Sequence, residues 1–110
     1  MSVFINGNNI SLTRGDSLIL NISMTRNGEP FYPSSGDSIR FALNKNKSGT
    51  ETPIIMKPID IQTMILRIQP EDTKSLDYGT YYYDIEYTSV EGYVDTFIGP
   101  ASFKLTEEVY

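Results

Sequence analysis

The sequence predicts an all-β fold: an immunoglobulin-like β-sandwich of seven or eight strands with at most one short helical turn. Turn-forming residues recur every eight to twelve positions, and apolar and polar residues alternate between them, as in sandwich strands. The third observation is residues 77–85 (DYGTYYYDI), where an acid, a glycine, a tyrosine and a core residue follow one another at two-residue spacing. This spacing marks the tyrosine corner of such sandwiches and makes Tyr81 the corner tyrosine.

The first strands are predicted at residues 10–12 and 17–25, with a turn at residues 13–16 between them. The inward positions of the second strand are Leu18, Leu20, Ile22 and Met24. Asn27 and Gly28 follow, and this dipeptide readily adopts the positive φ angles of a tight turn.

The middle of the chain alternates between loops and strands. Residues 30–37 contain two prolines and a Ser-Ser-Gly-Asp run, which predicts a loop. A strand follows at residues 38–44, and the polar residues 44–52 are predicted to be the most mobile loop. Further strands are predicted at residues 54–57 and 64–68.

The last third of the chain carries the corner. Residues 70–76 begin with proline and have acids in the first turn, which predicts one or two helical turns. Strands are predicted at residues 80–88, 93–98 and 101–105. The inward positions of the first of these are Tyr81, Tyr83, Ile85 and Tyr87.

Three details of this region are specific enough to be checked. Because a buried phenol needs a hydrogen-bond partner, we expect the Tyr81 hydroxyl to bond backbone near residues 72–75. Tyr83 stands where antibody domains place their second cysteine. Gly99 and Pro100 should interrupt strand pairing, since proline lacks an amide donor and glycine marks a bulge.

Length and composition limit the classes of function. The 110 residues are predicted to form one domain over residues 1–110. With no cysteine and no histidine, the chain offers neither the usual zinc ligands nor a thiol nucleophile nor an imidazole base. We predict no catalytic residue, no cofactor-binding residue and no metal ligand.

Charge and hydropathy argue against two kinds of partner. A net charge of −5 disfavours nucleic acid, whose binding requires a basic surface. No run approaches the 18 apolar residues of a membrane span, and the N-terminus lacks the features of a secretory signal. We therefore expect no membrane partner and synthesis in the cytoplasm.

The tyrosines raise the question of a binding surface. Five of the eight are predicted in loops or on outward faces: Tyr32, Tyr78, Tyr82, Tyr93 and Tyr110. Exposed tyrosine is enriched at protein interfaces and can also stack on sugar rings, but its β propensity alone places it on half-exposed strands. A glycan site would require a cluster at one end of the sandwich, with Tyr32, Tyr78 and Tyr93 as its members.

Two carboxylate pairs could in principle act as acid and base in glycoside hydrolysis, namely Asp72 with Asp77 and Asp84 with Glu86. Asp84 and Glu86 share one face of a strand. Outward charges that alternate with core residues are, however, what any solvated strand shows. We interpret both pairs as surface charges and predict that the protein is not an enzyme.

Four segments, in order, resemble a family of small domains in the tail and baseplate proteins of phages and prophages of Gram-positive bacteria. The resemblance is to the N-terminal immunoglobulin-like domain of the upper baseplate protein. The segments are residues 10–17 (ISLTRGDS), 36–41 (GDSIRF), 79–85 (GTYYYDI) and 98–105 (IGPASFKL). Together they extend over most of residues 10–106.

The resemblance implies a non-enzymatic structural module of a phage or prophage tail, located in the virion and acting through protein–protein contacts. Its implied partners are other tail or baseplate proteins, or further copies of the chain. The family often continues into further domains, whereas this chain stops soon after the last predicted strand. The alternative is a receptor- or carbohydrate-binding β-sandwich domain, with a glycan as the ligand.

Overall fold

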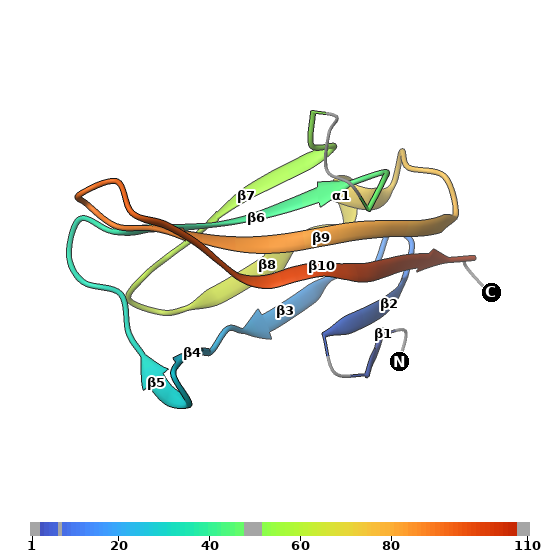
Figure 1. The fold of residues 1–110 in the computed structure, drawn as a ribbon. Helices are drawn as coiled ribbons and strands as arrows, with labels where there is room; N and C mark the ends of the chain where they lie inside the picture. The colour runs from blue at the N-terminus through green and yellow to red at the C-terminus, as the bar shows by residue number, and fades with distance from the viewer. Residues whose placement is uncertain (1–2, 7, 48–51, 108–110) are drawn as a thin grey trace.

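The computed structural model describes the backbone of residues 3–6 and the full residues 8–47 and 52–107, which form an all-β sandwich with one short helix. A six-stranded sheet in the order β1-β2-β10-β9-β6-β7 forms one layer (Figure 1). The pair β3-β8 forms the second layer, and the hairpin β4-β5 lies at one end. The elements are β1 (Val3–Asn6), β2 (Asn9–Thr13), β3 (Leu18–Asn21), β4 (Met24–Arg26), β5 (Glu29–Phe31), β6 (Ser38–Asn44), β7 (Ile55–Ile59), β8 (Ile65–Ile68), α1 (Pro70–Thr73), β9 (Gly79–Thr88) and β10 (Val94–Thr106).

The strand pairing confirms the predicted fold class. The strands β6, β9 and β10 lie side by side and antiparallel, and β3 pairs with β8 in the other layer. These are the C–F–G and B–E pairings of immunoglobulin-like sandwiches. The strand β2 is parallel to the last part of β10, with Phe103 opposite Ile10.

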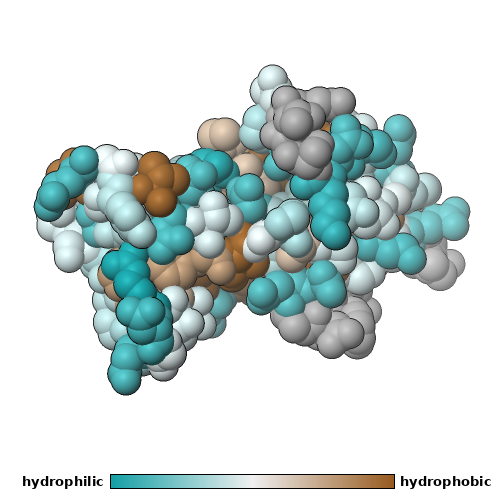
Figure 2. Space-filling view, in the orientation of Figure 1, coloured by the Kyte–Doolittle hydropathy of each residue, from teal (hydrophilic) through white to brown (hydrophobic). Residues whose placement is uncertain are grey.

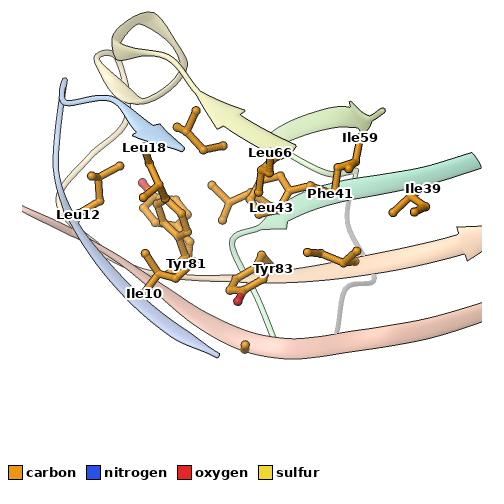
Figure 3. Close-up of a cluster of buried hydrophobic side chains, with 14 of the residues drawn as sticks. Ile10, Leu12, Leu18, Ile39, Phe41, Leu43, Ile59, Leu66, Tyr81 and Tyr83 are labelled. Atoms are coloured by element: carbon orange, nitrogen blue, oxygen red, sulfur yellow. The ribbon is translucent and has the colours of Figure 1, made fainter. Parts of the chain in front are cut away.

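The core lies between the two layers and follows the predicted alternation (Figure 3). Every second residue of β9 is buried, from Tyr81 to Tyr87, and β6 contributes Phe41 at 0% exposure. The rings of Phe41 and Tyr83 have centroids 5.4 Å apart, and Phe103 lies 6.3 Å from each of them. Burial of these apolar surfaces is the main force that holds the layers together.

The tyrosine corner is present with a different partner from the one expected. The Tyr81 hydroxyl donates to the backbone carbonyl of Asp77 at 2.9 Å, not to residues 72–75. Thr73, in the expected range, is already engaged, since its Oγ1 accepts from Gly15 N and its carbonyl from Leu76 N. At Gly79 the backbone has φ of 140°, which suits glycine at the sharp entry to β9.

Removing the corner hydroxyl gives the first prediction. Tyr81→Phe should lower the free energy of unfolding by about 1 kcal/mol, because the hydrogen bond to Asp77 is lost from a buried site. Urea unfolding of both proteins measures the difference. Tyr82→Phe, on the half-exposed face of the same strand, is the control and should change little. Equal stability of Tyr81→Phe and wild type would contradict the corner.

The described residues contain ten strands, where seven or eight were predicted, and the differences have local causes. The predicted strand at residues 17–25 divides into β3 and β4. The bond from Ile22 N to the Met64 carbonyl extends the β3–β8 pairing by one position, but Met64 N bonds the Asp60 carbonyl and Met64 has a φ of 55°, so the pairing ends there. The strand β5 begins at Glu29 and extends into the predicted loop 30–37, after a turn with φ of 55° at Asn27 and 79° at Gly28. The strand β1 was not predicted.

The last two predicted strands are one strand with irregular pairing. The register of β10 against β9 shifts between Thr96 and Ile98 and again between Ile98 and Ala101, so the predicted bulge at Gly99 and Pro100 is confirmed. The predicted helical turns at residues 70–76 are the single four-residue helix α1. Residues 48–51 of the predicted mobile loop lie outside the described residues, so that prediction stays open.

Candidate functional site

The end of the sandwich at the β9–β10 hairpin carries exposed apolar side chains. Val90 and Tyr93 in the connecting turn are 69% and 60% exposed, and Val94 at the start of β10 is 54% exposed. Figure 2 shows brown, apolar groups at this end among teal, hydrophilic ones. We call Val90, Tyr93 and Val94 the tip patch. Scattered apolar residues are normal on a surface, but three within five positions at a projecting hairpin make this end the candidate site for a partner.

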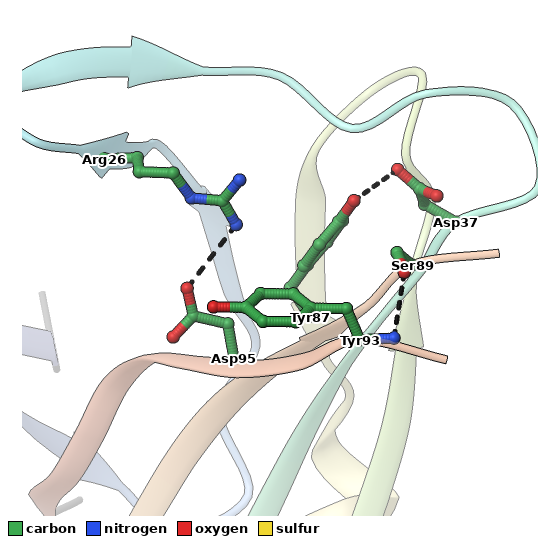
Figure 4. Close-up of polar contacts among 6 residues, drawn as sticks. All are labelled: Arg26, Asp37, Tyr87, Ser89, Tyr93 and Asp95. Atoms are coloured by element: carbon green, nitrogen blue, oxygen red, sulfur yellow. Dashed lines mark hydrogen bonds and ion pairs between the residues drawn. The ribbon is translucent and has the colours of Figure 1, made fainter. Parts of the chain in front are cut away.

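A hydrogen-bond network around Asp37 fixes the position of the tip (Figure 4). One carboxylate oxygen of Asp37 accepts from the Tyr87 hydroxyl at 2.6 Å and from Ser34 N at 2.8 Å. The other oxygen accepts from Val90 N at 3.0 Å. The carboxylate thus ties the β5–β6 loop to both the end of β9 and the hairpin turn.

The same contacts shift two pKa values in opposite directions. The hydrogen bond from Tyr87, followed by that from Ser34 N, holds the pKa of Asp37 below its ordinary value of 3.8. The bond to the negative Asp37 raises the pKa of the Tyr87 hydroxyl above 10.0, and burial of Tyr87 adds to this. Both shifts favour the pair found in the structure, a carboxylate that accepts from a neutral phenol.

This network predicts a specific pH dependence of stability. Because the folded-state pKa of Asp37 is lowered, its stabilisation is present above pH 3.8 and is lost as the pH falls through the folded-state pKa. The wild type should therefore be more stable than Asp37→Asn by a constant free energy of unfolding at pH values well above 3.8. This difference should shrink as the pH falls below 3.8. Asp95→Asn removes a carboxylate at the same end without touching Tyr87 and serves as control. A difference that persists undiminished in acid would contradict the network.

Under the tip, an arginine lies among aromatic rings. The guanidinium of Arg26 on β4 lies 4.1 Å from the ring centroid of Phe31 and 5.7 Å from that of Tyr93. Its Nη2 is 3.5 Å from a carboxylate oxygen of Asp95, an ion contact between half-exposed groups. Phe31 also stacks on Phe97 at 5.5 Å, so the β4–β5 hairpin is packed against β10.

The charge at this end is mainly negative. Glu29 lies on β5, Glu91 in the β9–β10 turn and Asp95 on β10, and Asp37 is near them through its bond to Val90. Arg26 is engaged with Asp95 and the aromatic rings. The tip patch is thus an apolar surface with an acidic surround, which suits a partner surface that combines apolar and basic groups.

The five tyrosines predicted as surface residues do not form one cluster. Tyr32 and Tyr93 are 76% and 60% exposed at the end that carries the tip patch. Tyr78 precedes β9, and the ten residues of that strand place it at the opposite end, against Arg14 at 4.2 Å. Tyr32, Tyr78 and Tyr93 therefore do not form the cluster at one end of the sandwich that a glycan site of these residues would require. Tyr82 is half-buried on the outer face of the large sheet, and Tyr110 lies outside the described residues.

Three of the four carboxylates considered for glycoside hydrolysis, those of Asp72, Asp84 and Glu86, are held by other residues. Arg40 bonds both Asp84, at 3.0 Å, and Glu86, at 3.1 Å. Asp72 accepts from Gln69 N at the start of α1 and is 2.6 Å from the Lys57 ammonium. The Arg40 contacts link β6 to β9, and the contact of Lys57 with Asp72 links β7 to α1.

Within the described residues, no group of three or more acidic side chains is arranged to hold a metal ion, and no helix has the length and apolar character of a membrane span. Comparison of the chain with protein-family models, curated proteins and solved structures finds no match in any of the three.

Sequence reasoning missed three members of this site, Arg26, Asp37 and Val90. Asp37 lies in a predicted loop, and its bond to Tyr87 joins residues 50 positions apart. The available signal was the pair of apolar residues Val90 and Val94 around the predicted turn at Glu91 and Gly92, since a turn normally carries polar residues at its flanks.

Proposed function

We propose that this protein is a non-enzymatic structural module of a phage or prophage tail or baseplate, which acts through protein–protein contacts made by the tip patch. The observation that carries the proposal is the exposure of Val90, Tyr93 and Val94 on one ordered hairpin. Docking through such a surface gains affinity from apolar burial at its centre, and polar groups around it set the orientation.

Two further features support a docking role. The bonds of Asp37 to Tyr87 and Val90 hold the tip in place before binding, which reduces the entropy lost on association. The acidic surround favours a basic partner surface and speeds the encounter with it. The resemblance of the chain to baseplate domains supplies the class of partner, namely other tail or baseplate proteins or further copies of this chain.

The proposal is tested by introducing charged side chains into the tip patch and measuring whether the protein is still incorporated into phage particles. In phage produced from a complemented deletion strain, the double variant Val90→Glu and Val94→Glu should be lost from purified particles, because it places charges in the buried centre of the contact. The control is Met56→Glu, which is 57% exposed on β7, away from the hairpin. Normal incorporation of the folded double variant would contradict docking through the tip.

A further inference from the structure

The small layer of the sandwich has a free edge at β3. Its two strands, β3 and β8, pair only with each other, so β3 has a neighbouring strand on one side alone. The bond from Ile22 N to the Met64 carbonyl continues the β3–β8 register and shows which backbone groups face β8. Because hydrogen-bonded pairs alternate along an antiparallel ladder, Ile19 and Asn21 direct their N–H and C=O groups away from β8.

These outward backbone groups are unpaired. Among the described residues, no hydrogen bond reaches the N–H or C=O of Ile19 or Asn21 from that side. The edge also lacks the features that discourage strand addition, since β3 (LILN) contains neither a charged residue nor a proline. By contrast, β5 and β7 contain Pro30 and Pro58, and Lys57 adds a charge to β7. The edge of β3 is therefore open to a further strand.

A pocket of about 190 Å³ lies beside this edge, between the two layers. One wall is formed by residues 20–23, and the opposite wall includes Ile10 on β2, Ile85 on β9 and Ile98 on β10. The lining side chains are uncharged. A dry cavity of about 150 Å³ holds a benzene ring, so this volume suits one large apolar side chain.

The burial of paired residues shows that the small layer is incomplete on this side. Leu20 on β3 and Leu66 on β8 lie opposite each other, and both face the core. Leu66 is 1% exposed, whereas Leu20 and the neighbouring Ile22 are only partly buried. A strand added to β3 would cover these two side chains.

We infer that the edge of β3 binds an extended segment of a partner polypeptide, which adds a strand to the small layer and places one large apolar side chain in the pocket. Unpaired N–H and C=O groups at strand spacing recognise another strand, and the pocket selects the side chain. The uncharged lining disfavours a charged side chain at that position. The edge is distinct from the tip patch, and the inference does not rest on the proposed function.

The surface favours a single segment over a second copy of the folded domain. Ile10 on β2 lines the pocket, and β1 extends the large sheet one strand further, so this sheet continues past the free edge of β3. In a symmetric dimer through β3, the two β3 strands would lie about 4.8 Å apart, with both large sheets on the same side of the shared layer. The large sheets would then overlap. An extended segment brings no second sheet and avoids this overlap.

The test begins with selection of a displayed library of random heptapeptides against the full chain. The enriched peptides are synthesised and titrated into the isotope-labelled protein, and binding is followed through its backbone amide NMR signals. We expect the enriched peptides to share a large apolar residue with uncharged neighbours and to shift the signals of Ile19, Asn21 and Ser23, with none at Val90. The inference is overturned if no peptide is enriched, or if the enriched peptides shift the signals of the tip patch instead.

Two variants at one position separate backbone recognition from side-chain contact. Asn21→Pro removes the outward N–H without removing a bond to β8, and proline is tolerated where an edge N–H faces solvent. It should weaken peptide binding about tenfold. Asn21→Ala keeps the N–H and is the matched control, which should bind as wild type does. Binding of the folded Asn21→Pro variant at wild-type strength would overturn the inference.

Peptide variants repeat the test on unaltered protein, and they decide the matter if Asn21→Pro does not fold. An enriched peptide is N-methylated at each position in turn. The loss of binding should alternate along the peptide, because only every second N–H of an added strand faces β3. Losses without alternation would contradict strand addition. A protein that is already dimeric, with the Ile19 and Asn21 amides protected from hydrogen exchange, would show that a second copy occupies the edge and would also overturn the inference.

Discussion

Replacing Phe41 with alanine is expected to lower the free energy of unfolding by about 3–5 kcal/mol. Phe41 is 0% exposed, and its ring contacts those of Tyr83 and Phe103 where β6, β9 and β10 meet the second layer. Alanine would remove the ring and leave a cavity, because strands held in a paired sheet can move only a little to fill it. Since a domain of this size has a total stability of about 5–15 kcal/mol, much of the variant would be unfolded at moderate temperature.

Thermal and urea unfolding of Phe41→Ala measure this loss. Tyr32→Ala is the control, because Tyr32 is an aromatic residue that is 76% exposed and its loss should change stability by no more than about 0.5 kcal/mol. A loss of similar size in both variants would show that the core does not lie between these layers.

The second large effect is expected for Gly99→Ala. A Cβ at this position would lie 2.5 Å from the Cβ and 2.9 Å from the Cα of Asp84, and the φ angle of 131° is strained for any other residue. Overpacking costs about 1–3 kcal/mol and the backbone strain about 1–2 kcal/mol, so a total loss of about 3 kcal/mol is expected.

Gly92→Ala separates the two contributions to that loss. Gly92 has a φ of 93°, but nothing lies within 4 Å of a Cβ added to it. Its replacement should therefore cost only the strain, about 1–2 kcal/mol. If Gly99→Ala and Gly92→Ala lose equal stability, the close approach of the β10 bulge to Asp84 is wrong.

The parts of the fold that depend on local sequence could be predicted. The alternation in β6 and β9 identifies the buried face, because successive side chains of a strand point to opposite sides. The Asn27 and Gly28 turn and the Tyr81 corner each depend on a few adjacent residues with a defined backbone preference.

What could not be predicted depends on contacts between distant residues. The strand β5 contains Pro30 and would be rejected on propensity, yet its pairing with β4 and the stacking of Phe31 on Phe97 hold it in place. The Asp37 network and the ion contact of Arg26 with Asp95 likewise join separate hairpins.

The most direct test of the proposed function is quantitative peptide mass spectrometry on phage particles purified after induction of the strain that carries the gene. A structural module of the tail should be present at a fixed ratio to other tail proteins in every preparation, and that ratio should survive further purification. Absence of the chain from intact particles, in cells that do produce it, would contradict the proposed function.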